Sequence, residues 1–335
     1  MNAVGALRRK SPMRRLRRHE WSPVDRTVLI ALLAIAFGCL FLITYSLALG
    51  DPVPRRIDAA LVGDPAAQPR TVDAVEGVAG GKLDFRRYAS VAAARRAIDD
   101  QRVYAALDLT SSRPTLYVAS AAGASVARVL ERIYPVDPAV RVVDTHPLKA
   151  RDPNGLDVFY RMLVATIIGF ITVFQVLAQS GRLALRHHVA FVLILAVAAS
   201  FALTLVGGVL LHGLAPPNAE QWGILALHIV AVASFTLLMA VMLGRWAIVP
   251  TWLFFVILGN TSSGGAVSPA LLPAPFAFIS QWLPSGATVT ALRDAIYFRA
   301  DQHVRPIAVL AVWASALFAA WLIVARRRDA NAAAA

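Results

Sequence analysis

Long apolar runs constrain this chain more than any other feature of its sequence. Six runs hold few charged residues, and all but the fifth approach or exceed the roughly 20 residues that an α-helix needs to cross a bilayer. Only 16% of the residues are charged, against roughly a quarter in soluble domains. The pattern predicts an α-helical polytopic membrane protein with about six transmembrane helices. The predicted spans are residues 27–49, 158–178, 189–211, 223–243, 246–259 and 306–325.

Basic residues predict how these spans are oriented. Lys and Arg number 33 against 20 Asp and Glu, and the excess gathers in the N-terminal tail 1–26, the short loops around Arg182 and Arg245, and the C-terminal tail 326–335. Cytoplasmic loops of membrane proteins carry such an excess. We therefore expect a multi-pass protein with both termini in the cytoplasm. The abundance of Arg over Lys suggests a bacterial plasma membrane. Because topology accounts for the charge, we expect no nucleic-acid partner.

Residues 50–157, between the first two spans, alternate strand-like and helix-like periods. We expect an inserted extracytoplasmic α/β domain with helices on one face of its sheet. Ser90 is a suitable N-cap for one of these helices. The predicted strands are 57–62, 82–87, 103–109, 115–119 and 140–144, and the predicted helices are 71–78, 91–100 and 125–134.

The stretch 260–298 is too apolar and too rich in proline for an ordinary surface loop. Irregular backbone at membrane depth is tolerated only where protein or a watery cavity satisfies its polar groups. Within a five-helix membrane domain at 158–325, we therefore expect 260–298 to be a partly re-entrant outer segment. Its last part, 287–298, has Val289, Leu292 and Ile296 on one face and Arg293 and Asp294 on another, which predicts a helix lying at the membrane interface.

No pattern predicts covalent chemistry, a metal site or a bound cofactor. The nearest phosphate-binding loop, Gly77-Val-Ala-Gly-Gly-Lys82, is one residue short before the lysine, and Leu83 replaces the hydroxyl that binds Mg²⁺. The sequence also contains no Gly-x-Ser-x-Gly elbow and no His-Glu-x-x-His pair. We expect that the protein is not an enzyme, and that any ATPase activity belongs to a separate chain.

Polar side chains associated with the apolar runs are the candidates for a substrate path. They are Gln175, His228, Asn260, Ser262 and Ser263, the last three in the turn that follows the fifth span. Each residue has a second interpretation, in which it only hydrogen-bonds to a neighbouring helix or reverses the chain. The sequence leaves both interpretations open.

One segment resembles a known family. Leu258-Gly-Asn-Thr-Ser-Ser-Gly-Gly-Ala-Val-Ser-Pro269, with Leu271-Leu-Pro273 and Trp282-Leu-Pro-Ser-Gly286, looks like the permeases of the type-two ABC exporter superfamily. It is most similar to the Pip/YhgE-like branch, which has a large extracytoplasmic domain. The resemblance implies a homodimer or paralogous heterodimer and a separate nucleotide-binding ATPase subunit. It also implies an ATPase docking loop, which here contains Arg182, Arg186 and His187.

Two functions from different classes follow. The first is a membrane permease subunit of an ABC-type exporter that moves an amphipathic or lipid-like substrate and is surrounded by membrane lipid. The alternative is a non-transporting membrane scaffold or receptor whose outer domain binds an envelope component, a protein or a phage. A transporter predicts that changes at His228 or Asn260 impair function, whereas a receptor predicts that they do not.

Overall fold

The computed structural model describes residues 23–179, 183–210, 217–298 and 303–334. It divides into two compact units, Met1–Leu42 and Ile43–Ala335. The first helix, α1 (Pro23–Leu49), contains the candidate span Ala31–Leu49, of which only 6% is buried inside the structure. A helix that is apolar on all sides and so exposed is typical of a membrane-embedded segment.

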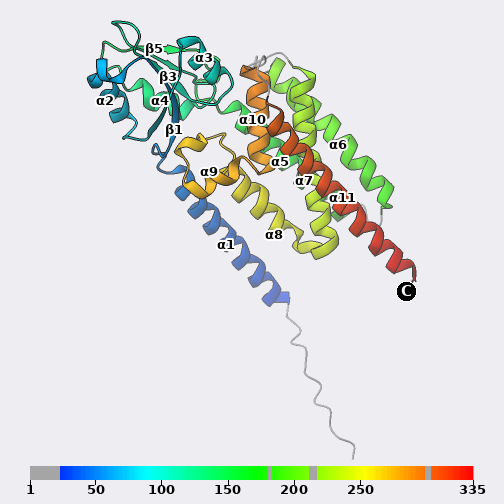
Figure 1. Cartoon of the computed structure of the whole chain (residues 1–335). Helices are drawn as coiled ribbons and strands as arrows, with labels where there is room; N and C mark the ends of the chain where they lie inside the picture. The colour runs from blue at the N-terminus through cyan, green and yellow to red at the C-terminus, as the bar shows by residue number, and fades with distance from the viewer. Residues whose placement is uncertain (1–22, 180–182, 211–216, 299–302, 335) are drawn as a thin grey trace, which may run out of the picture. The chain divides into compact units, whose positions relative to one another are not determined.

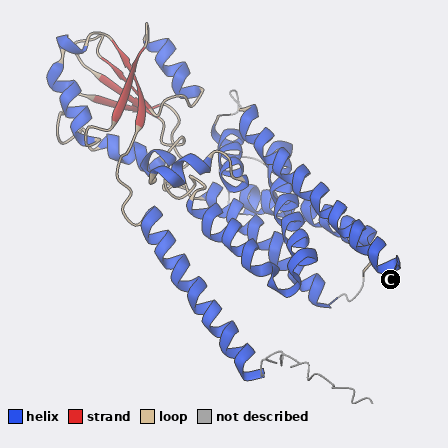
Figure 2. Cartoon of the chain, turned by 60° about the horizontal axis from the view of Figure 1, so that its bottom comes forward, coloured by secondary structure: helices blue, strands red, loops and turns tan. Residues whose placement is uncertain are grey.

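Five strands form one mixed sheet in the order β2-β1-β3-β4-β5 (Figures 1 and 2). All neighbouring strands are parallel except β3 and β4. The predicted strands therefore form, with ends that differ by up to two residues. Their bounds are β1 Ile57–Val62, β2 Leu83–Arg87, β3 Ala105–Asp108, β4 Thr115–Val118 and β5 Arg141–Asp144.

The helices of this α/β domain cover both faces of the sheet, so the prediction of helices on one face was wrong. On one face of the sheet, Ile57 and Leu61 of β1 pack in a core with residues of α2 and α4. On the other face, Ala60 and Val62 of β1 pack in a core with residues of α3. Connections between parallel strands are almost always right-handed. The chain crosses the sheet in one direction from β1 to β2 and in the opposite direction from β2 to β3, so the connecting helices α2 and α3 lie on opposite faces. The helices are α2 Pro69–Val78, α3 Val91–Asp99 and α4 Ala124–Glu131.

Within the described residues, five helical segments are long and apolar enough to cross a membrane, against the six spans predicted from the sequence. One of them, Ala219–Gly259, contains both the predicted fourth and fifth spans and reverses at Gly244, whose φ of +59° favours glycine. Across this reversal Phe235 stacks on Phe254 with ring centroids 5.3 Å apart. The two arms therefore lie side by side.

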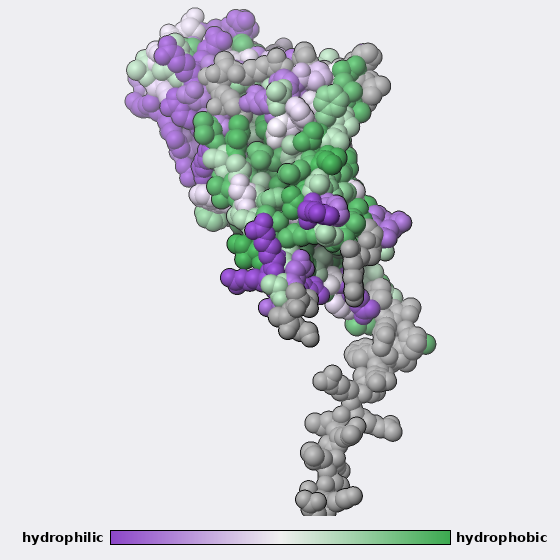
Figure 3. Space-filling model, turned by 90° about the vertical axis from the view of Figure 1, so that its right-hand side faces the viewer, coloured by the Kyte–Doolittle hydropathy of each residue, from purple (hydrophilic) through white to green (hydrophobic). Residues whose placement is uncertain are grey.

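The other helices of the bundle begin within about four residues of their predicted positions, but α11 continues past the predicted end at 325 to Ala334. Helix α6 continues into a π-helical turn, Val206–Leu210, and the second arm of the reversal contains a π-helical stretch, Trp252–Gly259. Hydrophobic side chains gather over the bundle face seen in Figure 3, and hydrophilic ones over the α/β domain. The helices are α5 Asp157–Gln179, α6 Leu185–Leu205, α7 Ala219–Leu243, α8 Ile248–Thr251 and α11 Val304–Ala334.

The segment 260–298 contains a 3-10 turn, Pro269–Leu271, and two helices, α9 (Ala274–Ser280) and α10 (Pro284–Tyr297). Helix α10 packs against α5, α7 and α11 (Figure 1) and 11 of its 14 residues are buried. The predicted interfacial helix at 287–298 is therefore a core helix of the bundle. Ala287 and Ala291 lie on another side of α10 and are also buried. Such small side chains allow this packing, because they let neighbouring helix backbones approach closely.

Candidate functional site where the α/β domain meets the bundle

Segment 260–298 contributes side chains to both cores of the α/β domain. Ala270 and Leu271 pack in the core below α2 and α4. Phe298 packs in the core below α3 and stacks on His146 with ring centroids 4.5 Å apart. The α/β domain at 50–157 is therefore completed by residues from a distant part of the chain.

Hydrogen bonds join the same segment to the sheet. The amide N–H of Arg55, just before β1, donates to the carbonyl of Ala270 at 3.1 Å. The Ser268 hydroxyl donates to the phenol oxygen of Tyr104, just before β3, at 3.2 Å, and its amide donates to Ser125 Oγ at 3.0 Å. The edge of the sheet where β1 and β3 begin is thus held against 268–270.

A buried carboxylate forms the strongest polar link between domain and bundle. Asp294 of α10 is fully buried, accepts a hydrogen bond from the Gln101 side-chain amide, and lies 3.1 Å from Nδ1 of His303. The other ring nitrogen of His303 lies 2.9 Å from the carbonyl oxygen of Asp100, so it must carry a proton. Asp294 and His303 therefore connect Gln101 and the Asp100 carbonyl of the domain to α10 and the start of α11.

Burial favours the protonated form of the Asp294 carboxyl group. It raises the pKa of the Asp294 carboxyl, because the charged form loses its hydration, while the Gln101 hydrogen bond acts in the opposite direction. Gln101 reaches Asp294 from a left-handed backbone conformation, with a φ of +51°. Such a conformation is uncommon outside glycine and is often found at functional positions.

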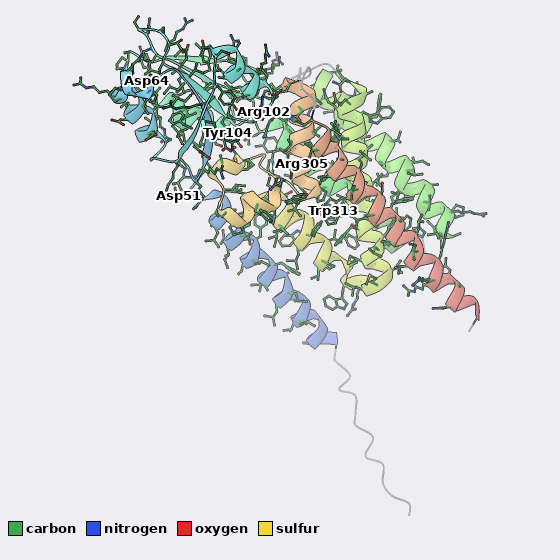
Figure 4. All side chains as sticks on the ribbon, viewed as in Figure 1. Asp51, Asp64, Arg102, Tyr104, Arg305 and Trp313 are labelled. Atoms are coloured by element: carbon green, nitrogen blue, oxygen red, sulfur yellow. The ribbon has the colours of Figure 1, made fainter. Side chains whose placement is uncertain are left out.

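A hollow of about 260 Å³ lies beside this link. Arg293 and Arg305 both line it. Tyr104 lines it from the domain and Arg305 from the start of α11, and both are labelled in Figure 4. Burial raises the pKa of the Tyr104 phenol, so it stays a neutral hydrogen-bonding group. We call this hollow the junction cleft. Its lining is Gln101, Val103, Tyr104, Ala122, Pro269, Gln281, Gly286, Ala287, Thr290, Arg293, His303, Arg305 and Pro306.

His228 lies fully buried in the bundle and joins three helices. Its Nε2 is 2.8 Å from the Thr166 hydroxyl of α5, and its Nδ1 is 2.9 Å from the Thr288 hydroxyl of α10. Each threonine hydroxyl also lies within 3.0 Å of a carbonyl oxygen of its own helix. A neutral imidazole has one donor and one acceptor nitrogen, so one threonine donates to the ring and the other accepts from it.

The other candidate path residues do not join His228. Gln175 is exposed on α5, nine residues beyond Thr166 and so about 13 Å further along the helix. Asn260, Ser262 and Ser263 are buried together in the turn after the π-helical stretch, where the Ser263 hydroxyl donates to the Asn260 carbonyl at 2.8 Å. The structure therefore separates the predicted path into three places.

The described part of the predicted docking loop consists of residues 183–184, which are not helical, and the start of α6. Arg182 lies outside the described residues. Arg186 and His187 are exposed in the first turn of α6, which begins at Leu185 rather than at 189 as predicted.

An ion pair inside a candidate span was missed. Arg161 of α5 is buried, and its Nε donates to Asp157 at 2.6 Å and its Nη1 to Gln221 of α7 at 3.2 Å. Gly207 faces the guanidinium so closely that a Cβ there would overlap it. An acid and a base four residues apart at the start of an apolar run were the available signal, since such residues share one helix face.

Comparison with known protein families, curated proteins and solved structures finds no match to this chain. Within the described ranges, no group of three or more His, Cys, Asp or Glu side chains is arranged to hold a metal ion. The polar side chains that line the junction cleft are arginines, a phenol, amides, a threonine hydroxyl and the His303 imidazole. Such groups bind and orient a ligand by charge and hydrogen bonds.

Proposed function

We propose that this chain is the membrane permease subunit of an ABC-type exporter that moves an amphipathic or lipid-like substrate. In this proposal the chain crosses the bacterial plasma membrane six times, with the short arm after Gly244 as the fifth span. Both termini are cytoplasmic and domain 50–157 lies on the outer face. Two permease chains assemble as a homodimer or paralogous heterodimer, and a separate ATPase supplies the energy.

The observation that carries the proposal is the dual packing of segment 260–298. Helix α10 is part of the bundle core, and Phe298 directly after it is part of the α/β domain core. A displacement of the bundle helices is therefore transmitted to the domain, because packed interiors shift between discrete arrangements rather than deform. The junction cleft lies beside this segment, so a movement that passes along the segment would change the shape of the cleft, as a site that opens and closes during export requires.

A second hollow, of about 270 Å³, supports an ATPase contact at the far end of the bundle helices. It lies among the ends of α5, α6, α7 and α11, and His188, Trp321 and Arg328 are part of its lining. Arg186 and His187 are exposed next to it in the first turn of α6. The lining also contains Asp329. An apolar hollow with charged residues of both signs fits an amphipathic element of a partner protein.

Affinity purification of the full-length protein from its native membrane tests the proposal. We expect a nucleotide-binding chain to co-purify and its ATPase activity to rise in the complex. Arg186→Ala combined with His187→Ala should reduce its recovery, whereas Arg87→Ala, an exposed arginine on β2, should not. A purified ATPase partner that neither binds the protein nor responds to it would refute the proposal.

One observation favours the alternative, a non-transporting scaffold or receptor. His228 has both ring nitrogens within hydrogen-bond distance of threonines and no exposed surface, as expected for a residue that only joins helices. A receptor predicts that Asn260→Ala leaves the cellular phenotype unchanged while changes on the α/β domain abolish ligand binding. An exporter predicts reduced efflux from Asn260→Ala.

A further inference from the structure

Within the described residues, the two arginines of the junction cleft donate hydrogen bonds to uncharged oxygens. Arg293 donates to the backbone carbonyl of Gly264 at 3.0 Å, and Arg305 donates to the side-chain carbonyl of Gln281 at 2.8 Å. Across the described part of the chain, neither guanidinium lies within 4.0 Å of a carboxylate. Asp294, although next to Arg293 in sequence, is bonded to Gln101 and His303 instead.

A partly buried arginine whose hydrogen bonds go to uncharged groups favours an anionic ligand. Burial lowers the pKa of the Arg293 guanidinium, while Tyr104, Asp294 and Tyr297 act in the opposite direction, and arginine stays protonated in proteins. A second guanidinium, that of Arg305, lines the same hollow. Paired guanidinium groups bind the oxygens of phosphates and carboxylates with charge-assisted hydrogen bonds.

The size of the cleft limits what enters it. A volume of about 260 Å³ is below the roughly 300–1,000 Å³ of sites that enclose a drug-sized ligand. A headgroup therefore fits, and a long hydrocarbon tail does not. The tail of an amphiphile must lie outside.

Exposed apolar side chains next to the cleft supply a surface for such a tail. Phe278 of α9 is 65% exposed and Val304 of α11 is 79% exposed. Trp282 lies under the Arg305 guanidinium at 4.9 Å and is half exposed, and Trp313 donates its indole N–H to the Trp282 carbonyl at 2.7 Å. Tryptophan and arginine together are typical of the level where lipid headgroups meet the hydrocarbon core.

We propose that the junction cleft binds the anionic headgroup, phosphate or carboxylate, of a membrane amphiphile whose tail lies along α9 and the first turns of α11. Arg293 and Arg305 bind the headgroup oxygens, and Tyr104 contributes its neutral phenol. The role of this ligand as an export substrate rests on the proposed function. Binding itself requires no ATPase, so the two ideas fail separately.

Equilibrium binding to the purified full-length protein in neutral detergent tests the site. The probes are short-chain phosphatidylglycerol, short-chain phosphatidylcholine and inorganic phosphate, with tryptophan fluorescence as the readout. We expect phosphatidylglycerol to bind at least about tenfold more tightly than the other two. Equal affinity for phosphatidylcholine would overturn the role of charge, and equal affinity for inorganic phosphate would overturn the role of the tail.

Variants locate the binding. Arg305→Gln should weaken phosphatidylglycerol binding about tenfold or more, and Arg305→Lys should restore part of it, because lysine keeps the charge without the planar fork. Arg87→Gln is the matched control and should leave affinity unchanged. Arg305 is exposed, so its variants are expected to fold, and an unchanged elution profile checks this. Unchanged affinity in Arg305→Gln would refute the site.

Discussion

Replacing Gly286 by alanine tests the packing that forms the junction cleft. Gly286 lies in the first turn of α10 and lines the cleft. A Cβ at this position would lie 2.8 Å from the carbonyl carbon of Ser280 and closer still to its oxygen. Ordinary contacts between carbon atoms are about 3.5–4.0 Å. The overlap involves backbone, so no side-chain rotation relieves it, and the turn between α9 and α10 has to move.

The magnitude follows from the surroundings of α10. The helix is enclosed by α5, α7 and α11, and overpacking in such interiors costs about 1–3 kcal/mol. A clash with backbone belongs at the upper end, about 3 kcal/mol. Alanine regains about 1 kcal/mol over glycine in a helix, which leaves a net loss of about 2 kcal/mol. At roughly 2–4 °C per kcal/mol, the melting temperature should fall by about 4–8 °C.

The assay is the loss of the monodisperse elution peak after heating the detergent-solubilised protein. Heating time is held constant, because membrane-protein unfolding is irreversible and its midpoint depends on rate. Gly223→Ala is the matched control, since Gly223 is an exposed glycine of α7 whose Cβ would meet nothing within 4 Å. We expect the control to melt at or slightly above the wild-type temperature. If Gly286→Ala has the same melting temperature as Gly223→Ala, Gly286 does not lie as close to the Ser280 backbone as described.

Three further changes test other parts of the structure. Thr288→Val removes the hydroxyl 2.9 Å from His228 Nδ1 and should cost about 1 kcal/mol in the same heating assay, within the range measured for interhelical bonds in membranes; no loss would show that this bond is absent. Burial raises the pKa of Asp294 in the folded state, so its contribution to stability is greatest below the unfolded pKa of about 3.9 and is lost as pH rises through the folded pKa. Asp294→Asn should therefore flatten the decline of melting temperature with rising pH, and an unaltered profile would contradict the burial. Ser90→Ala removes the cap on the Ala93 amide and should cost about 1 kcal/mol, seen as faster hydrogen exchange in the first turn of α3, whereas unchanged exchange would exclude the cap.

Local patterns predicted the secondary structure of the α/β domain well. Strand β1 begins and ends at the predicted residues, Ile57 and Val62, and the Ser90 side chain caps α3 by accepting from the Ala93 amide. The predictions that were wrong concern which neighbours a helix packs against. Val289, Leu292 and Ile296 indicated one apolar face on α10, but Ala287 and Ala291 on other sides are equally buried. Alanine is only weakly hydrophobic, so its burial is hard to predict from sequence. A helix that packs on several sides through alanines is therefore predicted to be amphipathic.

The junction could not be predicted from sequence for a different reason. Gln101 and Asp294 are 193 residues apart, and no spacing rule connects residues at such a separation. Arg293 and Asp294 were interpreted as the polar face of an interfacial helix, an environment in which both would be hydrated. In the structure the Asp294 side chain is fully buried, so its partners have to come from the protein.

The irregular backbone of segment 260–298 explains why the α/β domain and the bundle depend on each other. Polar backbone groups without regular helix or sheet partners require other partners when buried. The carbonyl of Gly264 receives its hydrogen bond from Arg293 of α10, whereas the carbonyl of Ala270 receives one from the Arg55 amide of the domain. The first part of the segment is thus bonded both to α10, the part of the same segment that packs in the bundle, and to the domain. Any motion that separates the domain from the bundle leaves part of this backbone without partners, so both must move together with the segment that lines the cleft.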